Sequence, residues 1–199
     1  QNTRTTVRSC SGGGKTSIAA RVGLCFLHNH YPATLITTAP TFRQVQDILW
    51  REIAMAQTGA RVRLAGVLTA VRLDIKDNWF ALGLSTDQPE RFQGFHNENI
   101  MIIGDEASGL PEGIYSAIEN PMATGNAHLL LIGNPTVPTG SFRATFNSPI
   151  YIKFHISAFD TPNFTRFGIT MEDIRNKTWR ELIGDKPLPT PFLITPQWV

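Results

Sequence analysis

The stretch Arg8–Ala20, RSCSGGGKTSIAA, places three consecutive glycines immediately before a lysine and a threonine. A phosphate-binding loop has the form G/A-x-x-x-x-G-K-[ST], because its backbone N–H groups must point at phosphate oxygens without obstruction from a Cβ. This frame runs from Ser9 to Thr16, and Gly14-Lys15-Thr16 fits it. Ser9 replaces the opening glycine, so the spacing alone leaves two interpretations open, a phosphate-binding loop and an ordinary turn.

The sequence on both sides of the glycines favours the phosphate-binding loop. Residues 3–9, TRTTVRS, are rich in β-branched side chains and predict a strand. Downstream, Ile18, Val22, Cys25 and Phe26 recur at helical spacing, which predicts a helix that ends before Pro32. The N-terminus of this helix would favour an anion through its unpaired N–H groups and its dipole.

These positions predict how ATP and Mg²⁺ would be bound. Lys15 would neutralise the β- and γ-phosphates, and the Thr16 hydroxyl would ligate Mg²⁺. The phosphates themselves would lie against the residues that precede the lysine, which are Ser11, Gly12, Gly13 and Gly14.

Two further polar clusters follow apolar runs. In NIMIIGDEASG, residues 99–109, Asp105 would support the metal ion and Glu106 would orient or deprotonate the attacking water. In AHLLLIGNPT, residues 127–136, the Asn134 amide would sense the γ-phosphate or the water, although a plain Asn-Pro turn explains this residue equally well. Both clusters stand where a strand would end.

The pattern of apolar residues predicts an α/β fold. The runs before the polar clusters do not alternate with polar residues, which indicates a mostly parallel sheet with helices on both faces. Residues 71–84 alternate on both sides of Asp77-Asn78 and predict a β-hairpin. In residues 41–53, Thr41 and Gln44 predict a helix with a capping box, whose apolar face is formed by Phe42, Val45, Ile48, Leu49 and Ile53.

Composition adds weaker constraints. A chain of 199 residues can form one α/β domain with a sizeable core, and its formal net charge of +2 does not by itself indicate nucleic acid. Its two cysteines predict reduced thiols in an intracellular protein, and no apolar run has the length of a membrane span. Because the chain starts at Gln1 without a methionine, we expect a fragment of a longer protein.

Taken in order, the motifs resemble the ATPase domain of the large terminase subunit, the DNA-packaging motor of tailed bacteriophages and related viruses. The resemblance covers nearly the whole chain. It rests on RSCSGGGKT, TAPTFRQVQDILWREI, PERFQGFH, IIGDEASGLPEGIYSAIE, LLLIGNPTVPTGSFRATF and ISAFDTPNF.

The resemblance implies a P-loop NTPase fold of the additional-strand, RecA-like type, with the hairpin as an insertion. It implies a Mg²⁺-dependent ATPase that drives double-stranded DNA into a procapsid in the cytoplasm of the infected bacterial host. The implied partners are a portal protein, a small terminase subunit and further copies of the chain in a ring, with no membrane.

The resemblance also assigns roles to residues at matching positions. It repeats the assignments of Lys15, Thr16, Asp105 and Glu106, and it places Asn134 and Thr136 in the motif that couples hydrolysis to movement. Family members carry a basic residue at or near the glycine loop, for which Arg8 is the candidate. They also use an arginine from a neighbouring subunit, for which the candidates are Arg91 and Arg143.

Family members continue into a nuclease domain with clustered acidic metal ligands. We therefore expect residues 1–160 to form the ATPase domain and residues 161–199 to form a tail or linker, with no nuclease activity in this chain. Two alternatives stay open. One is a helicase-type nucleic-acid-dependent ATPase, since TAPT followed by a helix resembles a helicase motif, and the other is a degenerate nucleotide-binding module without turnover.

Overall fold

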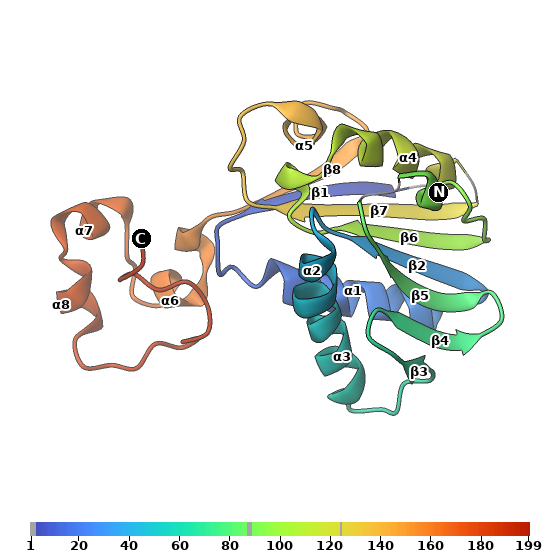
Figure 1. Cartoon of the computed structure of the whole chain (residues 1–199). Coiled ribbons are helices and arrows are strands. Elements are labelled where there is room, and N and C mark those ends of the chain that lie inside the picture. Colours follow the sequence, from blue (N-terminus) through green and yellow to red (C-terminus); the bar gives the residue numbers. More distant parts are fainter. Residues whose placement is uncertain (1–2, 87–88, 124) are drawn as a thin grey trace.

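The computed structural model describes residues 3–86, 89–123 and 125–199, and these residues contain an eight-stranded sheet with helices on both faces (Figure 1). The strand order is β3-β4-β5-β2-β6-β7-β1-β8. Every neighbouring pair from β5 to β8 is parallel, whereas β3, β4 and β5 pair antiparallel. The strands are β1 (Thr3–Ser9), β2 (Ala33–Thr38), β3 (Val67–Leu68), β4 (Arg72–Lys76), β5 (Trp79–Leu84), β6 (Asn99–Gly104), β7 (Asn126–Gly133) and β8 (Tyr151–Ile156).

The mostly parallel sheet and the hairpin β4–β5 confirm the sequence prediction. Helices α1 and α3 cover one face of the sheet, and α4 and α5 lie on the other (Figure 1). The helices are α1 (Lys15–Asn29), α2 (Phe42–Gln44), α3 (Trp50–Thr58), α4 (Glu112–Met122), α5 (Gly140–Thr145), α6 (Pro162–Thr165), α7 (Met171–Asn176) and α8 (Trp179–Ile183). Short 3₁₀ turns occur at Pro89–Phe92, Ala107–Gly109 and Ala158–Asp160.

The central strands are buried on both faces, which explains why their sequences do not alternate. In β6, Met101 and Ile103 belong to the hydrophobic cluster under α1 and α3, whereas Ile100 and Ile102 belong to the cluster under α4. Full burial of an isoleucine side chain contributes about 1.5–3 kcal/mol relative to its exposure. Each core strand is therefore fixed in register from two sides, and the polar residues that follow it are held in place.

Helix α1 packs against the sheet through three small residues and three large apolar ones, and only Phe26 of the residues that predicted the helix is both large and buried. Ala19, Ala20 and Gly23 are buried, while Ile18 and Val22 are 57% and 41% exposed. A Cβ on Gly23 would lie 2.9 Å from side-chain atoms of Leu35 and Ile103, so the helix approaches the sheet too closely for a larger side chain. The exposed residues line a groove of about 620 Å³ below β1 and β8.

The second helical segment begins with the predicted capping box. Gln44 N–H donates to Thr41 Oγ1 over 3.2 Å, and Thr41 N–H donates to Gln44 Oε1 over 3.0 Å. A π-helical turn, Val45–Leu49, then joins α2 to α3.

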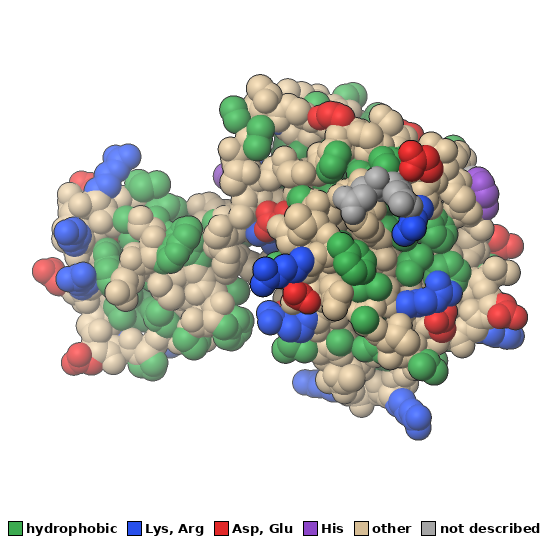
Figure 2. Space-filling view, in the orientation of Figure 1, with side chains coloured by type: hydrophobic (Ala, Val, Ile, Leu, Met, Phe, Trp, Pro, Cys, Tyr) green, Lys and Arg blue, Asp and Glu red, His purple; other side chains and the backbone are tan. Residues whose placement is uncertain are grey.

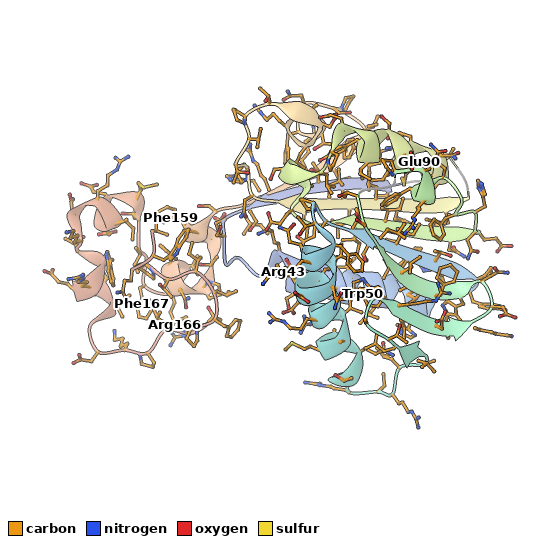
Figure 3. The ribbon with its side chains drawn as sticks, viewed as in Figure 1. Arg43, Trp50, Glu90, Phe159, Arg166 and Phe167 are labelled. Atoms are coloured by element: carbon orange, nitrogen blue, oxygen red, sulfur yellow. The ribbon has the colours of Figure 1, made fainter. Side chains whose placement is uncertain are left out.

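The prediction that Phe42 and Ile48 share the buried face of this segment is wrong. They are 43% and 42% exposed, whereas Val45, Leu49 and Ile53 are fully buried. The wider π turn rotates the chain relative to a regular α-helix, and this rotation brings Trp50 against the sheet (Figure 3). There, Trp50 Nε1 donates a 2.8 Å hydrogen bond to Thr37 Oγ1.

Residues from 157 onward form a smaller unit with its own hydrophobic cluster. Phe159 and Phe164 meet at a ring-centroid distance of 5.2 Å, and Phe167 packs against the same cluster (Figure 3). The smaller unit and the sheet-containing body meet at a narrow waist (Figure 2). The domain boundary expected at residue 160 and the assignment of residues 161–199 as a tail or linker both stay predictions.

Two compositional expectations concern cysteines and membranes. Both Cys10 and Cys25 have free thiols. In the described ranges, no helix has the length and apolar character needed to cross a bilayer.

Candidate active site

The glycine loop lies between the end of β1 and the start of α1, as the sequence predicted. Gly12 and Gly14 have φ values of 65° and 78°, in the left-handed region that favours glycine. Among the described residues, no hydrogen bond uses a backbone N–H group of residues 11–15 as its donor. These N–H groups stand at the N-terminus of a 15-residue helix, so the loop has the free donors that an anion requires.

Three neighbouring parallel strands bring the polar clusters together. The strands β6, β7 and β1 are adjacent, and their carboxyl ends carry Asp105-Glu106, Asn134 and the glycine loop. Lys15 Nζ lies 2.8 Å from Asn134 Oδ1 and 3.2 Å from Glu106 Oε1. The Asn134 amide also donates to Ser11 Oγ over 3.1 Å, so one asparagine contacts both the lysine and the loop.

Thr16 and Asp105 form an oxygen pair beside the lysine. The Thr16 hydroxyl donates to Asp105 Oδ2 over 3.0 Å, and the Glu106 N–H donates to Asp105 Oδ1 over 2.8 Å. Asp105 is only 3% exposed, and this burial raises the pKa of its carboxyl against the lowering effect of the two hydrogen bonds. A hydroxyl and a carboxylate at one point match the oxygen ligands that Mg²⁺ prefers.

Glu106 is held in an unusual backbone conformation. Its φ is 45° and its ψ is 46°, in the left-handed region that a non-glycine residue adopts at a cost. The turn is stabilised by the Tyr115 hydroxyl, which donates to the Ala107 carbonyl over 2.5 Å. This conformation presents the Glu106 carboxylate to Lys15 with 32% of its side chain exposed, so water can reach the group.

The loop after Asn134 is tied to the segment after Glu106. The Ser108 and Thr136 hydroxyls lie 3.2 Å apart, and the Ser141 N–H donates to Glu112 Oε1 over 3.0 Å. Hydrogen bonds from Ser141 lower the pKa of Glu112. These contacts join the segment after Asn134 to the segment after Glu106. The sequence indicated Thr136 through the resemblance. No short-range pattern indicated that Glu112, in the first turn of α4, would accept a hydrogen bond from Ser141 in the first turn of α5.

Arg8 lies apart from the phosphate-binding groups. Its guanidinium carbon is 5.2 Å from the centre of the Phe146 ring, and its Nε is buried with no hydrogen-bond partner among the described residues. Thr6, two residues earlier in β1, contacts α5, because Thr145 Oγ1 donates to Thr6 Oγ1 over 2.9 Å. The structure thus gathers Lys15 and the other predicted groups but directs Arg8 toward the α5 side of β1.

The two candidates for an arginine that acts on a neighbouring subunit are both on the surface. Arg91 is exposed beside the fully buried Phe92, and Arg143 is exposed on α5. No ion pair among the described residues uses either guanidinium. Both remain candidates.

One contact to the glycine loop has no counterpart in the sequence prediction. The Ile194 N–H, from the smaller unit, donates to the Gly12 carbonyl over 3.0 Å. Cys10, at the start of the loop, packs against the hydrophobic cluster of the same unit. The free N–H groups of the loop are left untouched by this contact.

The sheet order, the glycine loop at the end of β1 and the hairpin define a RecA-like ATPase fold. No protein-family model matches the chain, and no curated protein matches its sequence. Solved structures do match it. The ATPase domain of the large terminase of Thermus phage P74-26 superimposes with a TM-score of 0.59 at 18% identity, over 92% of this chain and 84% of that one.

A second match is the large terminase of another thermophilic bacteriophage, with a TM-score of 0.64 at 12% identity, over 89% of this chain and 44% of that protein. The same terminase has also been solved in complex with ADP, and that structure covers 88% of this chain. The chain therefore has the fold of the ATPase domain of phage large terminases, and it corresponds to less than half of the second terminase.

Proposed function

We propose that this chain is the ATPase motor domain of a viral large terminase subunit, which hydrolyses ATP to move double-stranded DNA into a procapsid. The observation that carries the proposal is the convergence of Lys15, Glu106 and Asn134 within 3.2 Å at the end of a glycine loop whose N–H groups are free. Such a site combines phosphate binding with a carboxylate that water can reach. The shared fold of phage terminase ATPase domains supports the motor assignment.

Each group has a role in this proposal. The N–H groups of residues 11–14 and the Lys15 ammonium bind the phosphates, and Glu106 orients or deprotonates the attacking water. Thr16 and Asp105 would hold Mg²⁺, which supplies positive charge beside the phosphates when bound. Phosphate oxygens would compete with Glu106 for Lys15, so binding of the nucleotide would release the carboxylate for its work on water.

Asn134 would couple changes at the phosphate site to the loop that follows it. Because its amide contacts both Lys15 and Ser11, a shift of either residue reaches the loop that continues to Thr136 and α5. This arrangement supports the coupling role that the family resemblance implies. The role expected for Arg8 stays a prediction, since its guanidinium stacks on Phe146 instead.

DNA would be held mainly through its phosphates, since a packaging enzyme must move along any sequence. Among the arginines of the first half, Arg4 pairs with Glu119 and Arg72 pairs with Asp74. Arg61 and Arg63 are exposed, and no ion pair among the described residues involves them. These two arginines are the natural contacts for a DNA backbone.

The remaining parts of the proposal concern assembly. The active form would be a homo-oligomeric ring in the cytoplasm of the infected bacterial host, with a portal protein and a small terminase subunit as partners. Arg91 or Arg143 would act on the neighbouring site of the ring. Residues 1–160 would be the ATPase domain, and residues 161–199 would lead toward a nuclease domain, so the chain itself would not cut DNA.

Phosphate release from ATP by the purified chain, with and without Mg²⁺, tests the proposal. We expect slow Mg²⁺-dependent release that rises with protein concentration, because a transition-state arginine from a neighbour contributes about 10³- to 10⁵-fold in related enzymes. Lys15→Ala should abolish it. ATP binding without release would favour the degenerate module, and strand displacement on a partial duplex would favour the helicase.

A further inference from the structure

The segment of residues 192–198 lies directly against the glycine loop. The Ile194 N–H donates to the Gly12 carbonyl over 3.0 Å, and Ile194 is itself buried. A Cβ on Gly14 would lie 3.4 Å from Leu193 Cδ2, so the contact extends along the loop. Gly12 and Gly14 therefore both lie close to the smaller unit.

A buried asparagine holds this segment in place. Asn163, on α6, is fully buried, and its amide nitrogen donates to the Thr190 and Ile194 carbonyls over 2.8 and 3.0 Å. Its side-chain oxygen accepts from both the backbone N–H and the hydroxyl of Thr190, each over 3.0 Å. Because a fully satisfied buried amide fixes the groups that it binds, the segment is a rigid support.

The segment and the loop together line an open hollow of about 320 Å³. Two large aromatic side chains at its rim are strongly exposed, Phe192 at 82% and Trp198 at 69%. None of the described lining residues is ionisable; they are Ser11, Gly12, Phe192, Leu193, Ile194, Thr195 and Trp198. An apolar hollow with free aromatic rings, open beside a phosphate-binding loop, is suited to a flat aromatic group.

We propose that Phe192 and Trp198 form the base-binding subsite for the nucleotide whose phosphates occupy the glycine loop. This inference rests on the proposed function, since it needs a bound nucleotide. The hollow shares Ser11 and Gly12 with the loop, so a base joined to the phosphates through a ribose lies within reach. Aromatic stacking depends on the area of the ring, so purines should bind more tightly than pyrimidines, with little distinction between adenine and guanine.

Calorimetric titration of the whole chain with ATP, CTP and inorganic tripolyphosphate tests the inference. Tripolyphosphate occupies the phosphate site without a base. We expect Phe192→Ala and Trp198→Ala each to weaken ATP binding by about 5- to 150-fold, the range for loss of a base–aromatic stack, and to leave tripolyphosphate binding unchanged. Trp198→Phe should retain most of the affinity, because it keeps an aromatic ring.

Two controls separate this inference from the proposed function. Phe154→Ala removes another exposed phenyl ring, 53% accessible on the edge strand β8, and should change none of the three affinities. Lys15→Ala should weaken ATP and tripolyphosphate together. Thermal unfolding of every variant checks that the fold is retained.

The outcomes are distinct. If the unaltered chain binds neither ATP nor tripolyphosphate, the proposed function fails. If it binds ATP and the Phe192→Ala/Trp198→Ala double variant binds ATP as tightly, the inference is overturned while the proposed function stands. Equal losses for ATP and tripolyphosphate would overturn it as well, because the aromatic residues would then support the loop rather than a base.

Discussion

Replacing Glu106 by glutamine tests the centre of the proposed mechanism, because the change keeps the shape of the side chain and removes its charge. The structure predicts two effects of this change, a loss of turnover and a gain in affinity for the phosphates. The carboxylate that orients or deprotonates water is lost, which should lower turnover by about 10²- to 10⁴-fold. At the same time Lys15 loses the carboxylate that lies 3.2 Å away, so one competitor of phosphate for its ammonium is removed while its hydrogen bond to Asn134 remains.

The second effect can be estimated from exposure. The Lys15 side chain is 9% exposed and that of Glu106 is 32% exposed, so the pair is partly screened by solvent and contributes about 1 kcal/mol. Since about 1.4 kcal/mol corresponds to a tenfold change in affinity, Glu106→Gln should bind ATP about fivefold more tightly. Tighter binding with slower turnover is the expected result.

Calorimetry for affinity and phosphate release for turnover measure the two effects separately. Glu119→Gln is a matched control, because Glu119 forms an ion pair of 2.6 Å with Arg4 near the opposite end of β1. It should leave both affinity and turnover unchanged. Wild-type turnover in Glu106→Gln would refute its catalytic assignment, and weaker ATP binding would refute the competition for Lys15.

Three further perturbations test the glycine loop, the Asp105 carboxyl and the proposed DNA contacts. A Cβ on Gly13 would lie 2.5 Å from the buried Ser9 Oγ, so Gly13→Ala should abolish nucleotide binding while circular dichroism shows an unchanged fold. Burial raises the pKa of Asp105, so ionisation of this carboxyl destabilises the folded state at pH values above its folded-state pKa. Asp105→Asn should therefore increase the free energy of unfolding, measured in urea at pH 7.5. This increase should become smaller as the pH falls through the folded-state pKa. Replacing both Arg61 and Arg63 by alanine should weaken binding to random DNA duplexes uniformly. The slope of log K against log salt concentration should fall by about 2, because two phosphate contacts are lost. A loss of affinity confined to one sequence would contradict the backbone-contact assignment.

Local rules account for much of what the sequence could predict. The loop between a strand and a helix, the capping box at Thr41 and the hairpin β4–β5 each depend on residues close together in the chain. The site follows from one further rule, because parallel strands place their carboxyl ends at the same edge of a sheet. That rule alone brings Lys15, Asp105 and Asn134 together from three segments.

The errors arise where tertiary packing decides the outcome. Periodicity identified the helix at 15–29 but did not show that Ile18 and Val22 are exposed, because the close approach of the helix to the sheet at Gly23 is not encoded by apolar patterns. The π turn at Val45–Leu49 likewise changes the period within a correctly predicted helical segment. The strand period predicts that Thr6 and Arg8 share one side of β1, but it does not tell which helix covers that side, and the role of Arg8 stays a prediction. The contact of Ile194 with Gly12 joins opposite ends of the chain, and no local pattern could reveal it.

The serine that breaks the loop pattern is accommodated by the glycine that lies four residues after it. Ser9 Oγ donates to the Cys10 carbonyl over 3.1 Å, and it occupies the space that a Cβ on Gly13 would need. A serine at the first position therefore requires glycine at position 13, whereas the glycines at 12 and 14 are favoured by their positive φ values.

Two further contacts restrain the same loop. Asn134 holds the Ser11 hydroxyl and Ile194 holds the Gly12 carbonyl, and neither contact uses a loop N–H group. Ordering the backbone of a flexible residue costs about 1–2 kcal/mol, so a loop that is already ordered avoids that cost when phosphate arrives. Affinity for the nucleotide should consequently depend on Asn134 and Ile194 even though the loop itself supplies the N–H donors, and the two residues belong to the two units that meet at the waist of the molecule.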